Sequence, residues 1–160
     1  CLAQLIDVYE DYGGSVLGVQ QVPQSQVSRY GIVAPHKVKP NVWQAVDLVE
    51  KPEAEKAPSR LAVLGRYVLT PAIFDILEHT KPGAGEEIQL TDAICELARK
   101  EKVYAYRFEG RRYDIGDKEG FLEATVEQAL KRPEIRDDFM AYLVQRIGPL
   151  LRQKMEEDAE

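Results

Sequence analysis

The residues of this chain whose types suit chemistry are charged side chains placed where apolar segments end. Glu50-Lys51-Pro52 closes the segment 42–50. A carboxylate accepts hydrogen bonds from hydroxyl groups and an ammonium group attracts an anion, so the pair suits a ligand that carries both. In open α/β sheets, ligands bind at the carboxyl ends of strands, where this pair is expected. An ordinary solvated loop start is the alternative interpretation.

A glycine interrupts each of two expected strands, at Gly31 in the segment 29–33 and at Gly65 in the segment 61–69. Glycine weakens a strand interior, and it often marks a place where a ligand or another backbone comes close. A β-bulge explains each glycine equally well.

An acidic pair follows the segment 111–115. Asp114 lies before Gly116, where its carboxylate could hold a magnesium ion, whereas Asp117 is expected to cap the helix that follows. The alternative role for Asp114 is a hydrogen bond within a turn. Further upstream, Thr91 or Asp92 is expected to cap a helix, and a loop before a helix suits either an anion or a structural joint.

The composition excludes several classes of site. The sequence contains two histidines and two cysteines, too few for a four-ligand zinc site or a disulfide framework. It contains no Gly-x-Ser-x-Gly, no Gly-x-x-x-x-Gly-Lys and no Gly-x-Gly-x-x-Gly motif. Its 160 residues carry a net charge of −6, which argues against nucleic acid, and no apolar run is long enough to suggest a membrane partner. We therefore expect a cytoplasmic protein.

The elements that must position these residues form a mixed pattern of strands and helices, which predicts an α/β or α+β sheet domain with a C-terminal helical arm. A surface excursion is expected at 36–41, a loop at 81–85 and a bend or break at Gly148-Pro149. Thr70-Pro71 is expected to start a helix, with Thr70 as its cap. The expected strands are 15–22, 29–33, 42–50, 61–69 and a hairpin of 103–108 with 111–115; the expected helices are 1–12, 70–77, 90–98, 118–131 and a segment after Pro133.

In this order and spacing, the segments resemble the C-terminal part of the bacterial UTP–glucose-1-phosphate uridylyltransferases. The resemblance covers roughly residues 1–132. The Glu-Lys-Pro motif is shared by sugar-nucleotide pyrophosphorylases in general, and the Glu-Ile-Gln-Leu-Thr-Asp and Glu-Gly-Arg-Arg-Tyr-Asp motifs are particular to the uridylyltransferase branch. The matching stretches are Val27 to Val33, Val49 to Pro52, Gly65 to Leu69, Pro82 to Ile94 and Phe108 to Lys118.

The resemblance implies part of a Rossmann-like nucleotidyltransferase, with the substrates glucose 1-phosphate and UTP, the product UDP-glucose, and Mg²⁺ as cofactor. Carried over by position, the Gly31 backbone would contact a glucose hydroxyl, and Glu50 would accept hydrogen bonds from the sugar hydroxyls. Lys51 would contact phosphate. Asp114 would be a magnesium ligand, as in the thymidylyltransferase relatives. No protein side chain is expected to act as the nucleophile, because the sugar phosphate itself attacks.

The resemblance also implies a division of labour along the chain. Residues 1–132 would be the sugar-binding half, and residues 133–160 a helical arm that forms a homo-oligomer or folds back on its own domain. The Gly-rich nucleotide-binding loop of the family does not precede Cys1, so we expect these 160 residues alone to form no UDP-glucose. The alternatives are part of a thymidylyl- or adenylyltransferase, and a non-catalytic module for sugar-phosphate binding or oligomerisation.

Overall fold

The computed structural model describes residues 1–83 and 86–158, and the chain divides into two units, Cys1–Gly110 and Arg111–Glu160. The expected loop at 81–85 thus lies in part outside the described residues. The elements of the first unit are, in chain order, α1 (Leu2–Tyr12), β1 (Ser15–Gln21), η1 (Gln24–Arg29), β2 (Gly31–Lys39), β3 (Val42–Glu50), η2 (Ala54–Lys56), β4 (Leu61–Val68), α2 (Ala72–Leu77), α3 (Leu90–Lys100) and β5 (Val103–Arg107).

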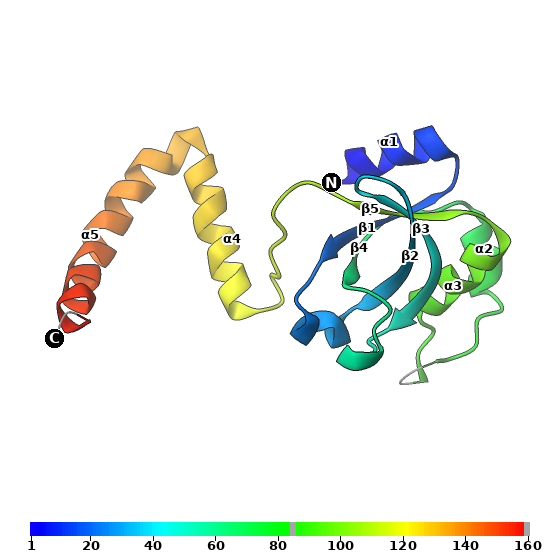
Figure 1. Ribbon diagram of the computed structural model, residues 1–160. Helices are drawn as coiled ribbons and strands as arrows, with labels where there is room; N and C mark the ends of the chain where they lie inside the picture. The colour runs from blue at the N-terminus through cyan, green and yellow to red at the C-terminus, as the bar shows by residue number, and fades with distance from the viewer. Residues whose placement is uncertain (84–85, 159–160) are drawn as a thin grey trace. The chain divides into compact units, whose positions relative to one another are not determined.

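The strands of the first unit form one mixed sheet in the order β1-β4-β2-β3-β5, which closes because β5 also pairs with β1 (Figure 1). The β1–β5 pair is parallel, and the other pairs are antiparallel. Residues 61–68 form β4, as the strand expected at 61–69, with β1 on one side and β2 on the other.

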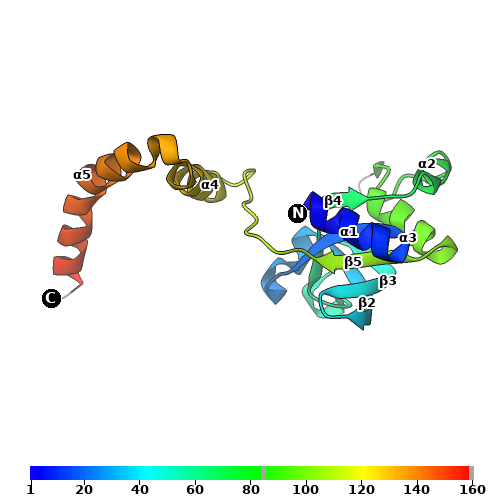
Figure 2. The same ribbon diagram turned by 90° about the horizontal axis from the view of Figure 1, so that it is seen from above.

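Alternation along the strands sends neighbouring side chains to different apolar clusters. Leu17 packs in the cluster that includes α2 and α3, whereas Val16 packs in the cluster that includes α1, and both are fully buried. This is the period of two that strand geometry imposes. In Figures 1 and 2, α1 accordingly lies on a different side of the strands from α2 and α3.

Hydrogen bonds around the buried Ser15 link three places where one element of the first unit leads to the next: α1 to β1, β4 to α2, and α3 to β5. Ser15, which is fully buried, accepts a hydrogen bond from the Thr70 amide at 3.0 Å and donates one to Glu101 at 3.1 Å. The Thr70 hydroxyl also donates to Glu101, at 2.7 Å. Thr70 therefore does not cap α2 as expected, since that helix begins at Ala72 without a side-chain cap.

The segment 36–41 lies at the surface as expected, with residues 36–40 exposed, but most of it is strand rather than an irregular excursion. Strand β2 continues to Lys39, and Pro40 and Asn41 form a two-residue turn into β3. Asn41 takes a left-handed φ of 64°, a conformation that asparagine adopts more readily than most residues. Pro35 is tolerated inside β2 because the register with β3 shifts between Ala34 and Pro35.

The expected hairpin of 103–108 with 111–115 is wrong, because residues 111–115 form no strand. The physical reason lies in β5, whose two edges already pair with β1 and β3. No edge of β5 remains for a returning strand.

The second unit contains α4 (Lys118–Lys131) and α5 (Pro133–Glu157). Asp117 caps α4 as expected, and its carboxylate accepts a hydrogen bond from the Gly120 amide at 3.2 Å. The segment before α4 is held by its side chains, since Arg111 donates to Glu123 and Glu127. The sequence predicts a bend or a break at Gly148-Pro149, and the helix does not break there, because α5 continues through both residues.

The hydrogen bonds of Ser15 with Thr70 and Glu101 predict an effect on stability. Replacing Ser15 with alanine removes a partner of both the Thr70 amide and the Glu101 carboxylate, which should lower the free energy of unfolding by about 1–3 kcal/mol. Urea unfolding followed by circular dichroism measures the difference. The control is Ser28→Ala, at an exposed position, which should change stability by less than about 0.5 kcal/mol. Equal stabilities of the two variants would contradict the structural role of Ser15.

Candidate functional site

Two of the sequence-predicted site residues lie directly opposite each other in the sheet. Gly31 is the first residue of β2 and Glu50 is the last residue of β3, and the antiparallel register pairs them. Beyond this pair, the Lys51 amide donates to the Tyr30 carbonyl at 3.1 Å, which extends the pairing by one residue. The structure therefore brings Gly31, Glu50 and Lys51 together at one end of the β2–β3 hairpin.

The Glu50 carboxylate is largely sheltered, with its side chain 19% exposed. Its Oε2 accepts a hydrogen bond from the Thr91 hydroxyl at 2.6 Å. Its Oε1 lies 3.9 Å from the Lys51 Nζ, and the Lys51 side chain is 63% exposed. A sheltered acceptor thus stands beside an ammonium group that solvent and ligands reach easily.

Lys51 leaves the strand in an unusual conformation. Its φ is +44°, in the left-handed region that residues other than glycine rarely adopt. Such a conformation costs on the order of 1–3 kcal/mol and tends to occur at ligand-binding sites. The turn carries the chain away from β3 directly after Glu50.

The space around Gly31, rather than its φ, favours glycine at this position. A Cβ atom at this position would lie 3.0 Å from Glu50 Oε2 and 3.2 Å from Thr91 Oγ1. The absence of a side chain therefore lets the carboxylate and the hydroxyl meet beside the β2 backbone. Neither of the interpretations made from sequence, a close-approaching ligand or a β-bulge, included this contact between protein groups.

Thr91 binds Glu50, and Tyr67 lies close enough to feel the charge of Glu50, although the sequence alone gave neither residue a functional role. Thr91 was expected to cap a helix, but α3 begins at Leu90 with Gln89 before it. Burial raises the pKa of the Tyr67 phenol, and the nearby Glu50 charge raises it further. A usable signal for Thr91 was its spacing of three residues from Ile94, which puts both on the same side of α3.

Cys95 and Asp47 form a second polar contact between α3 and β3. The Cys95 thiol donates to Asp47 Oδ1 at 2.8 Å. Burial raises the pKa of this thiol, and the hydrogen bond to Asp47 raises it further. The thiol is therefore held in its neutral form, which favours anchoring of the helix over nucleophilic reactivity.

Asp114 belongs to the second unit, whereas the Gly31–Glu50 pair belongs to the first. Its Oδ2 accepts a hydrogen bond from Arg112 at 3.1 Å, and its backbone carbonyl accepts one from the Asp117 amide at 3.1 Å. A Cβ atom at residue 120 would lie 2.3 Å from that carbonyl, so Gly120 permits the close packing. Within residues 1–83 and 86–158, no group of three or more His, Cys, Asp or Glu side chains could hold a metal ion.

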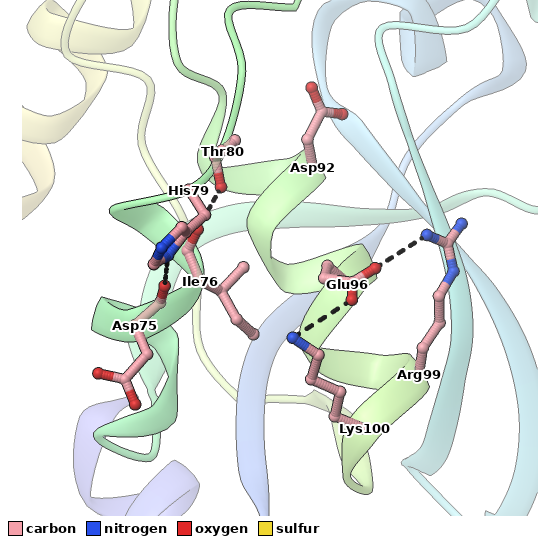
Figure 3. A pocket seen from close by; sticks show the side chains of 8 residues that line it. All are labelled: Asp75, Ile76, His79, Thr80, Asp92, Glu96, Arg99 and Lys100. Atoms are coloured by element: carbon pink, nitrogen blue, oxygen red, sulfur yellow. Dashed lines mark hydrogen bonds and ion pairs between the residues drawn. The ribbon is translucent and has the colours of Figure 1, made fainter.

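A pocket of about 420 Å³ opens between α2 and α3, and its lining includes none of the predicted site residues (Figure 3). Its Glu96 carboxylate lies 3.1 Å from Arg99 and 3.3 Å from Lys100, whose hydrogen bonds lower the pKa of Glu96. In Figure 3 the carboxylates of Asp75 and Asp92 point away from this group. Glu96, Arg99 and Lys100 thus pair with one another, and the carboxylates of Asp75 and Asp92 do not converge with them on a ligand.

Comparison with protein families identifies the class. The model of the family described as "Nucleotidyl transferase" matches residues 2–130. The chain belongs to this family, which confirms the expected α/β nucleotidyltransferase fold. Along the part of the chain that the structure describes, no helix combines the length and apolarity needed to cross a membrane.

The similar curated proteins share one activity in their names. The chain is 53% identical over 144 residues to the UTP–glucose-1-phosphate uridylyltransferase of Staphylococcus epidermidis, covering 90% of this chain and 50% of the relative. It is 49% identical over 143 residues to UTP–glucose-1-phosphate uridylyltransferase 2 of Streptococcus pyogenes, covering 89% and 48%. The chain spans about half the length of the curated relatives it matches.

Solved structures agree with the assignment of the chain to the nucleotidyl transferase family. A UDP-glucose pyrophosphorylase complexed with UDP-glucose matches with a TM-score of 0.77 and 44% identity, over 81% of this chain and 49% of that one. The UTP-bound enzyme of Acinetobacter baumannii matches with a TM-score of 0.78 and 35% identity, over 90% and 50%. A glucose-1-phosphate thymidylyltransferase structure from Bacillus anthracis, 20% identical with a TM-score of 0.58, over 76% and 46%, shares the fold.

The contact between Gly31, Glu50 and Thr91 makes a prediction. In Gly31→Ala, the added methyl group must push the Glu50 carboxylate or the Thr91 hydroxyl aside, which should lower the free energy of unfolding by about 1–3 kcal/mol. Urea unfolding measures the loss. The control is Gly148→Ala, whose Cβ would meet only Arg152 Nη1 at 3.9 Å and which should raise stability, since alanine favours a helix. An unchanged stability of Gly31→Ala would contradict the close packing.

Proposed function

We propose that this chain supplies the glucose-1-phosphate-binding part of a UTP–glucose-1-phosphate uridylyltransferase. That enzyme transfers the uridylyl group of UTP to glucose 1-phosphate and gives UDP-glucose and pyrophosphate. The observation that carries the proposal is the sheltered Glu50 carboxylate with the exposed Lys51 ammonium group 3.9 Å away, at the end of β3.

The two charges suit the two ends of a sugar phosphate. Glu50 is an acceptor that ligand hydroxyl groups can donate to, and the neighbouring Gly31 brings the backbone close to the same place. The Lys51 side chain, 63% exposed, can reach the phosphate and neutralise part of its charge. Glu50 therefore accepts hydrogen bonds from the sugar hydroxyls, and Lys51 binds the phosphate.

With these roles for Glu50 and Lys51, no protein side chain needs to act as a nucleophile. A phosphate oxygen of glucose 1-phosphate attacks the α-phosphorus of UTP, and the bond from that phosphorus to the bridging oxygen of pyrophosphate breaks. The electron pair leaves with pyrophosphate. Such a transfer depends on alignment of the reactants and on neutralisation of charge, which are the roles given to Glu50 and Lys51.

Asp114 fits a magnesium ion as a single ligand. Mg²⁺ is often held by one or two carboxylates together with substrate phosphates. The Asp114 side chain is 36% exposed, and it offers hard carboxylate oxygens, of which Oδ2 accepts from Arg112. When bound, Mg²⁺ would neutralise charge on the phosphates.

The relatives favour this function over its alternatives. The proteins near 50% identity are named uridylyltransferases, whereas the thymidylyltransferase structure is 20% identical. A non-catalytic module has no separate observation in its favour. The C-terminal position of the chain within the enzyme and its cytoplasmic location stay predictions.

Binding of glucose 1-phosphate tests the proposal by isothermal titration calorimetry. Glu50→Gln should weaken binding of glucose 1-phosphate at least about tenfold, since a hydrogen bond to a charged group contributes about 1.5–3 kcal/mol. It should leave the binding of inorganic phosphate unchanged, whereas Lys51→Met should weaken the binding of both.

The controls are Glu55→Gln and Lys56→Met, which make the same changes of charge at exposed positions of η2. Both should bind glucose 1-phosphate as the parent does. Failure of the parent to bind, or equal binding by the parent and the Glu50 and Lys51 variants, would overturn the proposed function.

We also propose that residues 1–132 are the sugar-binding half and that the arm, residues 133–160, joins copies of the chain in a homo-oligomer. Helix α5 contains no buried residue. Apolar side chains recur along it, among them Val144 at 67% and Leu151 at 57% exposure. Removal of such side chains from water is favourable, which supports an apolar partner such as a second copy.

Charges placed on α5 test the oligomer. The parent should have a mass of two or more chains in size-exclusion chromatography with light scattering. Val144→Glu with Leu151→Glu should reduce it to that of one chain, 18.1 kDa, because each glutamate disfavours an apolar contact. Gln145→Glu with Gln153→Glu adds the same charges at two polar positions and should not. A parent with the mass of one chain would refute this proposal.

A further inference from the structure

We propose that Thr91 is a positioning residue that fixes the Glu50 carboxylate for the hydroxyl groups of the sugar. This inference rests on the proposed function and deepens it. Thr91 lies 41 residues from Glu50 in the chain, yet its hydroxyl is 2.6 Å from Glu50 Oε2. An ionised carboxylate has no hydrogen to give, so the hydroxyl donates, and bonds to a charged acceptor of this length are strong.

Helix α3 gives Thr91 a fixed position. Ala93, Ile94 and Leu97 on this helix are at most 1% exposed and pack in the main apolar cluster. One turn after Thr91, Cys95 binds Asp47 of the same strand that carries Glu50. Threonine itself is stiff, because branching at Cβ restricts its first side-chain torsion. The packing of α3 in the apolar core therefore fixes the position of the Thr91 hydroxyl.

Glu50 needs such a support because its side chain is long. Fixing a glutamate in one conformation costs up to about 1.5–2 kcal/mol of side-chain entropy. With Oε2 held by Thr91, that cost is met before a ligand arrives, and Oε1 keeps one direction, 3.9 Å from Lys51 Nζ. A ligand then binds a carboxylate that is already oriented, which is the gain from preorganisation.

Gly31 completes the arrangement from the opposite strand. Its missing side chain leaves the space in which Glu50 Oε2 and Thr91 Oγ1 meet, since a Cβ would lie within 3.2 Å of both. Three separate elements, β2, β3 and α3, thus meet at one carboxylate oxygen. Thr91 acts on the sugar through Glu50 and need not touch the ligand.

The first experiment measures the conformation of Glu50 without a ligand. Three-bond NMR couplings of the Glu50 side chain should indicate one dominant rotamer in the parent and in Thr91→Ser, which keeps the hydroxyl. In Thr91→Val, which keeps the branched shape and loses the hydroxyl, the couplings should move toward the averaged values of a free side chain. Unchanged couplings in Thr91→Val would overturn the proposal.

The second experiment measures binding of glucose 1-phosphate in a double-mutant cycle. Thr91→Val should weaken binding about tenfold in the parent and less than about twofold in the Glu50→Gln background, because the hydroxyl acts through the carboxylate. Thr91→Ser should restore binding to within about threefold of the parent, while inorganic phosphate should bind all variants alike. The control is Thr125→Val, which removes a hydroxyl that donates to the Phe121 carbonyl in α4.

The outcomes separate the two proposals. A parent that does not bind glucose 1-phosphate overturns the proposed function, and the couplings still decide whether Thr91 holds Glu50. A parent that binds, with a Thr91→Val loss of the same size in the Glu50→Gln background, overturns the role of Thr91 and leaves the proposed function standing.

Discussion

The pairing of β2 with β3 sets the position of the groups in the candidate site. It places Gly31 opposite Glu50, and the next residue continues the pairing through its amide to Tyr30. Side chains alternate between the two faces of a strand, so a register slip of one residue would turn Glu50 to the other face. The carboxylate would then lose the space beside Gly31 and the hydroxyl of Thr91 together. The geometry of the site therefore depends on a backbone register rather than on the ion pair with Lys51.

Helix α3 connects that register to the apolar core. Its buried side chains pack with β1, β3 and β5, and its polar side chains at 91 and 95 bind two acidic residues of β3. The first group supplies stability, and the second aligns the helix with the strand. The apolar and the polar side chains lie on the same rigid helix. A loss of core packing under α3 would therefore also displace the Thr91 hydroxyl from Glu50.

Local signals in the sequence located several elements and site residues correctly. Strand β3 ends at Glu50 as expected, with Pro52 two residues further, and Asp117 caps α4. The signals failed where a partner far away in the chain decides the outcome. Thr91 and Thr70 both carry the marks of helix caps, yet their hydroxyls bind Glu50 and Glu101, 41 and 31 residues away. Gly31 and Glu50 were each identified as site residues, but their contact depends on a pairing that neither segment encodes alone.

Closure of the sheet also governs how the first unit can meet other proteins. Each of the five described strands has a neighbour on both sides. An open edge strand offers unpaired amide and carbonyl groups to which a strand of another chain can add, and proteins commonly protect such edges against aggregation. Among the described strands the ring of pairings reduces that template, although β2 meets β4 at one residue pair, Ile32 with Ala62. Strand β1, paired along its length with β4 and with β5, offers no free backbone edge to another chain. Recognition at this strand would therefore depend on side chains.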